Sequence, residues 1–230
     1  MKKKILSTFL IFLLTITFTA CGSSKSDKSD RYYNDSSNND TINDEIETKE
    51  PTESDIMISK ISKLIDEKQA FDAGSYIKGD IPADEYAFIK FSGSGSYYCE
   101  KDGAGNIVDN ENFDSFGYVK VHAVGNLETD GVLIKTSAFD KLGVKGAKEI
   151  YEKLNDQSDW NQSGYYKVGT DIEPGKYVVE SMGSGYWAIM TGPVSNSDIV
   201  DNDNFNGKAT INLSNGRYLK LSKATITKAN

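Results

Sequence analysis

The stretch IVDNENF, residues 107–113, recurs as IVDNDNF, residues 199–205, with a difference at a single position. A Gly-Ser-Gly tripeptide precedes each stretch, at residues 93–95 and at residues 183–185. Self-similarity with a repeat of this length is typical of tandem domains, whereas solenoids have shorter periods and more copies. The folded part of the chain is therefore predicted to consist of two related units.

The similarity extends beyond these stretches. Upstream, Tyr86 matches Tyr177, and downstream, Val119 and Val121 match Ile211 and Leu213. Farther on, residues 134–137 are matched to residues 219–222, which assigns extra residues of the first copy to a loop around 126–130.

Short β-branched and aromatic runs predict strands at residues 177–180, 186–190, 209–213 and 218–221. Breaks at Pro174-Gly175, Gly183–Gly185, Gly192-Pro193 and Asn215-Gly216 separate these runs. Such short runs and regular turns predict a small antiparallel sandwich or barrel. Asn215-Gly216 is predicted to form a hairpin with a type I′ turn, in which both central residues have positive φ.

Each copy opens with a helical pattern. We expect Ser54 to cap a helix with one apolar face, made of Ile58, Ile61, Leu64 and Ile65. After Gly146, a second helix has its apolar face at Ala147, Ile150, Tyr151 and Leu154. The second helix either covers its own sheet or braces the two units together. The predicted fold class is mainly β with short helices (α+β): two tandem small antiparallel β-sandwich or barrel modules, each preceded by an amphipathic helix.

The N-terminus has the pattern of an export signal. Lys2–Lys4 form a cationic region, residues 5–14 are apolar, and Ala20 is a small residue suited to cleavage. The apolar run is too short and too rich in Ser and Thr to span a membrane, which takes about 20 apolar residues. The segment Phe18-Thr19-Ala20-Cys21 resembles the lipobox of bacterial lipoproteins, although Phe18 stands where Leu is usual.

This resemblance implies acylation of Cys21, the lipidation site, and anchoring to the outer face of the cell membrane. The alternative is an ordinary secretory signal cut near Ala20. The predicted domains are a lipoprotein signal peptide at 1–20, a lipid-anchored disordered tether at 21–53, a helix plus β module at 54–143, and a second helix plus β module at 144–230. The tether is predicted from its polar, charged composition.

Residues 164–225, and less closely residues 76–139, look like a β module of secreted and surface proteins of Firmicutes. The resemblance rests on the pattern VGxDIxxGxY, then GSGY, IVDN(D/E)NF and GxYLKL. It implies an extracytoplasmic accessory or binding domain and no catalytic activity.

The net charge of −8 argues against a nucleic-acid partner, because phosphate backbones recruit clustered Lys and Arg. Removal of Lys2–Lys4 with the signal makes the mature chain more acidic still. Once Cys21 is acylated, Cys99 is the other thiol of the chain, so no intrachain disulfide is expected. We interpret Cys99 as a packed core residue.

The repeated acidic stretch is the first candidate site. Asp109, Glu111, Asp201 and Asp203 place carboxylates at alternate positions, as a Ca²⁺ site requires. The spacing is not that of an EF-hand, because Phe113 and Phe205 stand where that loop has a further ligand. The alternative is an Asx-rich turn followed by a phenylalanine in the core. No cofactor is expected, and Ca²⁺ is the one alternative.

The aromatic pairs after each Gly-Ser-Gly are the second candidate, a ligand-binding surface made of Tyr97, Tyr98, Tyr186 and Trp187. Exposed aromatic rings stack on sugars or peptides, but neighbours in a strand point to opposite faces. One member of each pair is therefore expected in the core.

Catalysis has little support, since His122 is the single histidine and the chain has neither a Gly-x-Ser-x-Gly elbow nor a phosphate loop. We interpret the chain as a lipid-anchored extracytoplasmic binding or accessory protein for a wall component, a polysaccharide or a protein. The alternatives are a structural or assembly lipoprotein without a ligand pocket and, third, a hydrolase of surface glycan. The oligomeric state stays open.

Overall fold

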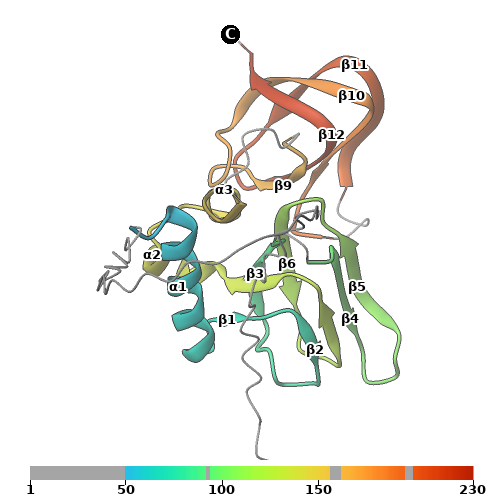
Figure 1. The fold of residues 1–230 in the computed structure, drawn as a ribbon. Coiled ribbons are helices and arrows are strands. Elements are labelled where there is room, and N and C mark those ends of the chain that lie inside the picture. Colours follow the sequence, from blue (N-terminus) through green and yellow to red (C-terminus); the bar gives the residue numbers. More distant parts are fainter. Residues whose placement is uncertain (1–49, 92–93, 156–161, 195–198, 230) are drawn as a thin grey trace, which may run out of the picture. The chain divides into compact units, whose positions relative to one another are not determined.

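The computed structural model describes residues 50–91, 94–155, 162–194 and 199–229, which belong to one compact unit, Thr48–Asn230. The described chain contains three short α-helices and several antiparallel sheets (Figure 1). The predicted mainly β fold with short helices is therefore confirmed. Among the described strands, no ladder closes a sheet into a barrel, so the barrel form of the prediction is not adopted.

The first half of the fold contains two four-stranded antiparallel sheets. One has the order β1-β8-β3-β6 and the other the order β2-β7-β4-β5. The strands of the first are β1 (Ala70–Phe71), β8 (Val132–Lys135), β3 (Asp84–Ile89) and β6 (Phe116–Val121). Those of the second are β2 (Gly74–Tyr76), β7 (Leu127–Thr129), β4 (Tyr97–Lys101) and β5 (Ile107–Asn112). Strand β3 pairs on both sides and buries the run 86–89 in the core.

The second half forms one sheet with the order β11-β10-β12-β9. Its strands are β10 (Gly175–Met190), β11 (Ile199–Leu213), β12 (Tyr218–Lys228) and β9 (Gly164–Lys167). Three of them are much longer than predicted. In β10 two predicted strands are joined, because residues 183–185 do not end a strand. They lie within β10 at a register shift, where Gly183 has a φ of +87°. A bulge bends a strand without terminating it, and glycine adopts the positive φ at low cost.

The two halves share part of their strand register. Tyr86 pairs with Val119, and their counterparts Tyr177 and Ile211 pair in the same way. The match of residues 134–137 to 219–222 was wrong, however. Ile134 pairs with Ala87 of β3, whereas its supposed counterpart Leu219 pairs with Ile189, which follows the bulge of β10. Residues 127–129, predicted to lie in an extra loop, form β7. Strands β7 and β8 together correspond to β12, because β7 pairs with β4 and β8 with β3, whereas β12 pairs with both parts of β10.

The predicted hairpin at Asn215-Gly216 was also wrong. The turn exists, because the Arg217 N–H donates to the Ser214 carbonyl at 3.2 Å and Gly216 has a φ of +76°. Strands β11 and β12 do not pair with each other, since β10 lies between them. Asn215 is not in the positive-φ region, which excludes type I′.

Helix α1 (Glu53–Asp66) begins two residues earlier than expected. Thr52, not Ser54, is its N-cap, and Thr52 and Asp55 form a reciprocal capping box. The Ser54 hydroxyl instead donates to the Leu154 carbonyl at 3.0 Å. Met57, Ile61 and Leu64 form the buried face, while Ile58 is exposed, because it lies one residue round the helix from Met57.

Helix α3 (Ala147–Asn155) buries the predicted face, made of Ala147, Ile150, Tyr151 and Leu154. It contacts α1, strands β3 and β6 of the first half, and β9 of the second half. Of the two alternatives for the second helix, these contacts support the one in which it packs against both units. The short α2 (Phe139–Leu142) precedes α3 and adds Phe139 and Leu142 to a core that extends through both halves.

Candidate functional site

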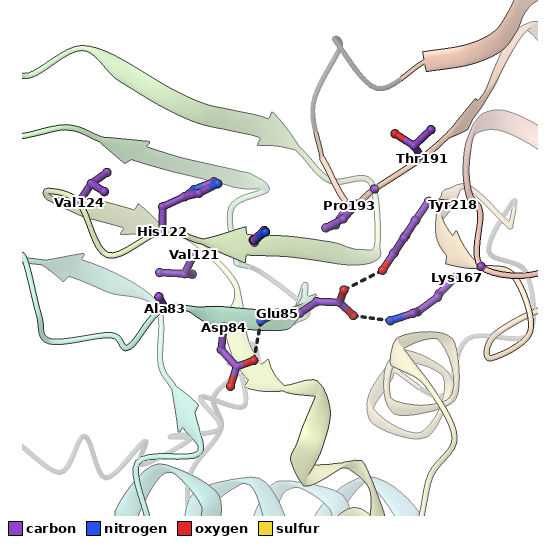
Figure 2. Close-up of a pocket in the computed structure, with 13 residues that line it drawn as sticks. Ala83, Asp84, Glu85, Val121, His122, Val124, Lys167, Thr191, Pro193 and Tyr218 are labelled. Carbon is purple, nitrogen blue, oxygen red and sulfur yellow. Dashed lines mark hydrogen bonds and ion pairs between the residues drawn. The ribbon is translucent and has the colours of Figure 1, made fainter.

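An open groove of about 870 Å³ lies where the two halves meet. Figure 2 shows its lining residues. One wall comes from β3, the end of β6 and the segment 122–124. The opposite wall comes from Lys167 of β9, the segment 191–193 after β10, and Tyr218 at the start of β12. The groove therefore depends on the docking of the two halves.

Glu85 connects the two walls. Its Oε1 lies 2.6 Å from the Lys167 Nζ, and its Oε2 accepts a hydrogen bond from the Tyr218 hydroxyl at 2.7 Å (Figure 2). Burial and the neighbouring carboxylate of Glu85 raise the pKa of Tyr218, so the hydroxyl stays protonated and donates. Both oxygens of Glu85 are thus engaged by the second half of the fold.

Glu100 of β4 is fully buried and fixes the one histidine of the chain. Its carboxylate accepts hydrogen bonds from the backbone N–H groups of His122, at 2.9 Å, and Val124, at 3.3 Å. It also lies 3.0 Å from the His122 Nδ1. A carboxylate at Nδ1 holds the ring in one orientation and places its proton there, which leaves Nε2 for other partners. The side chain of His122 is 37 % exposed and lines the groove.

A smaller pocket of about 370 Å³ adjoins the groove and shares His122 with it. Asp109 and Lys120 also line this pocket, together with the segment 191–194. Burial raises the pKa of Asp109 to about 6, while a backbone hydrogen bond from Asn110 and the nearby His122 oppose the shift. Asp109 is therefore ionised at neutral pH, although burial makes its charged form less favourable. A cation bound beside it would offset this cost of burial.

Asp171 holds the base of the site together. Its carboxylate accepts the Tyr118 hydroxyl at 2.7 Å, the Lys148 N–H at 3.0 Å and the Lys167 N–H at 2.8 Å. The Tyr118 oxygen in turn accepts the Ala147 N–H at 3.1 Å. Burial raises the pKa of Asp171, against the effect of these donors. The cluster fixes the start of α3 and the end of β9, and with them the backbone that carries Lys167.

The four aromatic candidates do not form one surface. Tyr98 and Trp187 are buried, whereas Tyr97 and Tyr186 are partly exposed. The expectation that one member of each pair is in the core is confirmed. The first pair lies in β4 and the second in β10, which belong to different sheets, and none of the four lines the groove.

The acidic candidates lie in strands β5 and β11, and not in the Asx-rich turn given as the alternative. Glu111 binds the Lys220 Nζ at 3.0 Å across the two halves, while Asp201 and Asp203 are exposed. The predicted burial of Phe113 and Phe205 is confirmed. Within the described residues, no group of three His, Cys, Asp or Glu side chains converges as a metal site would require. The expectation of no cofactor, with Ca²⁺ as the alternative, stays a prediction.

Cys99 is buried, as the packing interpretation expects. Cys21, the signal peptide and most of the tether lie outside the described residues. No helix in the described part of the chain has the length and apolar character needed to cross a bilayer.

The sequence analysis missed Glu85, Glu100 and Lys167. One signal was available for Glu100, since a carboxylate interrupts the apolar character of β4 at the position that Ile189 occupies in β10. Glu85 and Lys167 gave no such signal, because polar residues at strand ends are common and their contact forms only when the halves dock.

Residues 158–219 match the family described as Rv1352-like extracellular domain. The matched segment covers about a quarter of the chain and includes strands β9, β10 and β11 and the first residues of β12. The similarity indicates an extracytoplasmic protein. No curated protein and no solved structure matches the chain.

Proposed function

We propose that this chain is a lipid-anchored extracytoplasmic binding protein whose ligand occupies the groove between two homologous β units. The observation that carries the proposal is the groove itself. Its walls come from both halves, and the contacts of Glu85 and Asp171 hold these walls in place. A preformed concave site with a few oriented polar groups is the usual form of a ligand site.

The anchor and the duplication belong to the same proposal. The N-terminal pattern that ends at Cys21 supports lipidation, and the matched strand registers of Tyr86 and Tyr177 support two homologous units. A lipid on Cys21, followed by a polar spacer, would hold the groove outside the membrane. Two acyl chains give lasting membrane residence, whereas one gives only reversible binding.

We do not propose catalysis. The oriented His122 resembles a catalytic base in its contact with Glu100, but that contact equally suits a binding residue. The competing function is a structural or assembly lipoprotein in which the groove takes no ligand.

Blocking the groove distinguishes these functions. Val124→Arg and Pro193→Arg place a long side chain on opposite walls, and Val200→Arg on the exposed face of β11 is the matched control. Beads carrying each form of the chain from residue 50 onward are incubated with surface extract of the native organism. We expect the two groove variants to retain much less material than the wild type and the control. Equal retention by all four would contradict the proposal.

The anchor is tested separately in cells. We expect labelled palmitate to enter the wild-type chain and Cys21→Ala to abolish both labelling and membrane retention. Membrane retention of the variant would exclude Cys21 as the anchor.

A further inference from the structure

The smaller pocket beside the groove contains an acidic and a basic side chain that form no ion pair with each other or with any other described residue. These side chains are Asp109 and Lys120, and His122 lies with them. Most cations around the site are already engaged, as Lys167 is by Glu85 and Lys220 by Glu111. Two opposite charges are therefore left for a ligand.

Lys120 is placed to meet a negative group. It is the one exposed residue of strand β6, whose other residues are buried, so its side chain leaves the core on the groove side. Its cross-strand neighbour is Glu85, but both oxygens of that carboxylate bind Lys167 and Tyr218. The Lys120 ammonium group is thus available to a ligand carboxylate, with which a charge-assisted hydrogen bond is strong.

Asp109 and His122 are placed to meet a positive group. Asp109 is partly buried and lies across the β4–β5 ladder from Glu100, the residue that holds the imidazole. The Glu100 carboxylate favours the tautomer of His122 with its proton on Nδ1, and in that neutral ring Nε2 accepts a hydrogen bond from an ammonium group. The raised pKa of Asp109 agrees with a carboxylate that lacks its cation.

The rest of the pocket suits a small ligand with an apolar side chain. Val108, Pro193 and Val194 provide apolar contact, and the Thr191 hydroxyl adds a polar group. A volume of about 370 Å³ is at the low end of the range of ligand pockets, and it fits an amino acid or a dipeptide better than an oligosaccharide.

We propose that this pocket binds a small zwitterion, an amino acid or the free ends of a short peptide, with its carboxylate on Lys120 and its ammonium group on Asp109 and His122. The inference rests on the proposed function, because it assigns a chemical class to the ligand of the same site. It requires that loss of either charge from the ligand, or of either charged side chain, removes a defined part of the affinity.

The experiment titrates labelled protein, residues 50–230, with four probes and follows the backbone amides of Thr191 and Gly192 and the ring of His122 by NMR. The probes are alanine, alanyl-alanine, N-acetyl-alanyl-alanine and alanyl-alanine amide, which separate a free amino acid from a peptide and the ammonium from the carboxylate. The variants are Asp109→Asn and Lys120→Gln. Asp201→Asn and Lys208→Gln, on exposed positions of β11, are the matched controls.

We expect alanine or alanyl-alanine to shift the pocket signals and each blocked probe to bind roughly tenfold or more weakly, as the loss of a charge-assisted contact requires. Asp109→Asn should abolish the preference for the free amine, and Lys120→Gln the preference for the free carboxylate, while the controls keep both.

Absence of shifts with every probe at millimolar concentration would overturn the zwitterion inference. So would equal binding of the blocked and free probes. If the groove variants Val124→Arg and Pro193→Arg still reduce retention of surface material, the chemical class is wrong but the binding function stands. If they have no effect either, the proposed function fails as well.

Discussion

The Glu85 carboxylate and the Lys167 ammonium group lie 2.6 Å apart, although β3 and β9 belong to different sheets. The Tyr218 hydroxyl binds the other oxygen of the same carboxylate. Both charged side chains are about three-quarters buried, so water screens their attraction less than at the surface. The Glu85–Lys167 ion pair therefore links the two halves and also forms part of the groove wall.

Removing the charge of Glu85 tests how much this ion pair stabilises the fold. We expect Glu85→Gln to lower the free energy of unfolding by about 1–3 kcal/mol, because Lys167 loses its counter-ion in a partly buried place. Urea denaturation measures the change. Glu180→Gln is the control, since the exposed pair Glu180–Lys208 is expected to contribute less than about 1 kcal/mol. Equal effects of both substitutions would mean that the Glu85–Lys167 pair contributes no more stability than an exposed ion pair.

The Tyr118 hydroxyl is expected to matter for folding stability. Tyr118→Phe deletes the donor to the partly buried Asp171 and the acceptor of the buried Ala147 N–H, so both polar groups lose a partner. We expect a loss of about 2–4 kcal/mol in urea denaturation. Tyr97→Phe, at a partly exposed position, should change stability little. A cost below about 0.5 kcal/mol for Tyr118→Phe would show that water replaces these contacts.

Asp109 should make stability depend on pH. Its pKa is raised from 3.8 to about 6 in the folded chain, so the folded state binds the proton more tightly than the unfolded state. The associated stability is fully present below pH 4 and is lost as the pH rises through about 6. Because the group is only partly buried, we expect Asp109→Asn to stabilise the protein by about 1 kcal/mol at pH 7.5 and to have no such effect at pH 4. Thermal melts at the two pH values decide, and an equal shift at both would exclude this titration as the cause.

Trp187 is expected to serve the core and not a ligand. It is 7 % exposed, and Trp187→Ala should cost about 3–5 kcal/mol of unfolding free energy. Tyr97→Ala, at a partly exposed position of the other pair, should cost much less. If Trp187→Ala left stability unchanged, the buried position of this ring would be incorrect.

Calcium can be tested without any variant. Glu111 is already bound to Lys220, and Asp201 and Asp203 lie exposed along a strand. We expect the melting temperature to be the same in EDTA and in millimolar Ca²⁺, because only a ligand that binds the native state raises it. A higher midpoint with calcium would restore the acidic stretch as a metal site.

Local patterns predicted the elements well. The α3 face from Ala147 to Leu154 follows from its 3.6-residue period, and the burial of Phe113 and Phe205 follows from an apolar side chain after a polar run. The Ser54 cap was wrong because Thr52, two residues earlier, offers the same chemistry and has Asp55 as its capping-box partner.

Pairings between distant strands could not be predicted in the same way. Asn215-Gly216 has the composition of a hairpin, but the turn alone does not reveal that β10 separates the strands it joins. The groove was missed for a related reason. Glu85, Lys167 and Tyr218 meet only after two sheets dock, and no local period encodes that contact.

The position of β12 determines when the sheet of the second half can be completed during folding. Strand β9, the first of its sheet in the chain, pairs with β12, the last, through Gly164 and Leu221. A nascent chain that has not yet reached residue 218 has no partner strand for β9, and β10 lacks one of its two neighbours. Because such long-range pairs form late, this sheet is completed only when the end of the chain is available. The groove wall that carries Lys167 and Tyr218 is therefore among the last parts of the molecule to form.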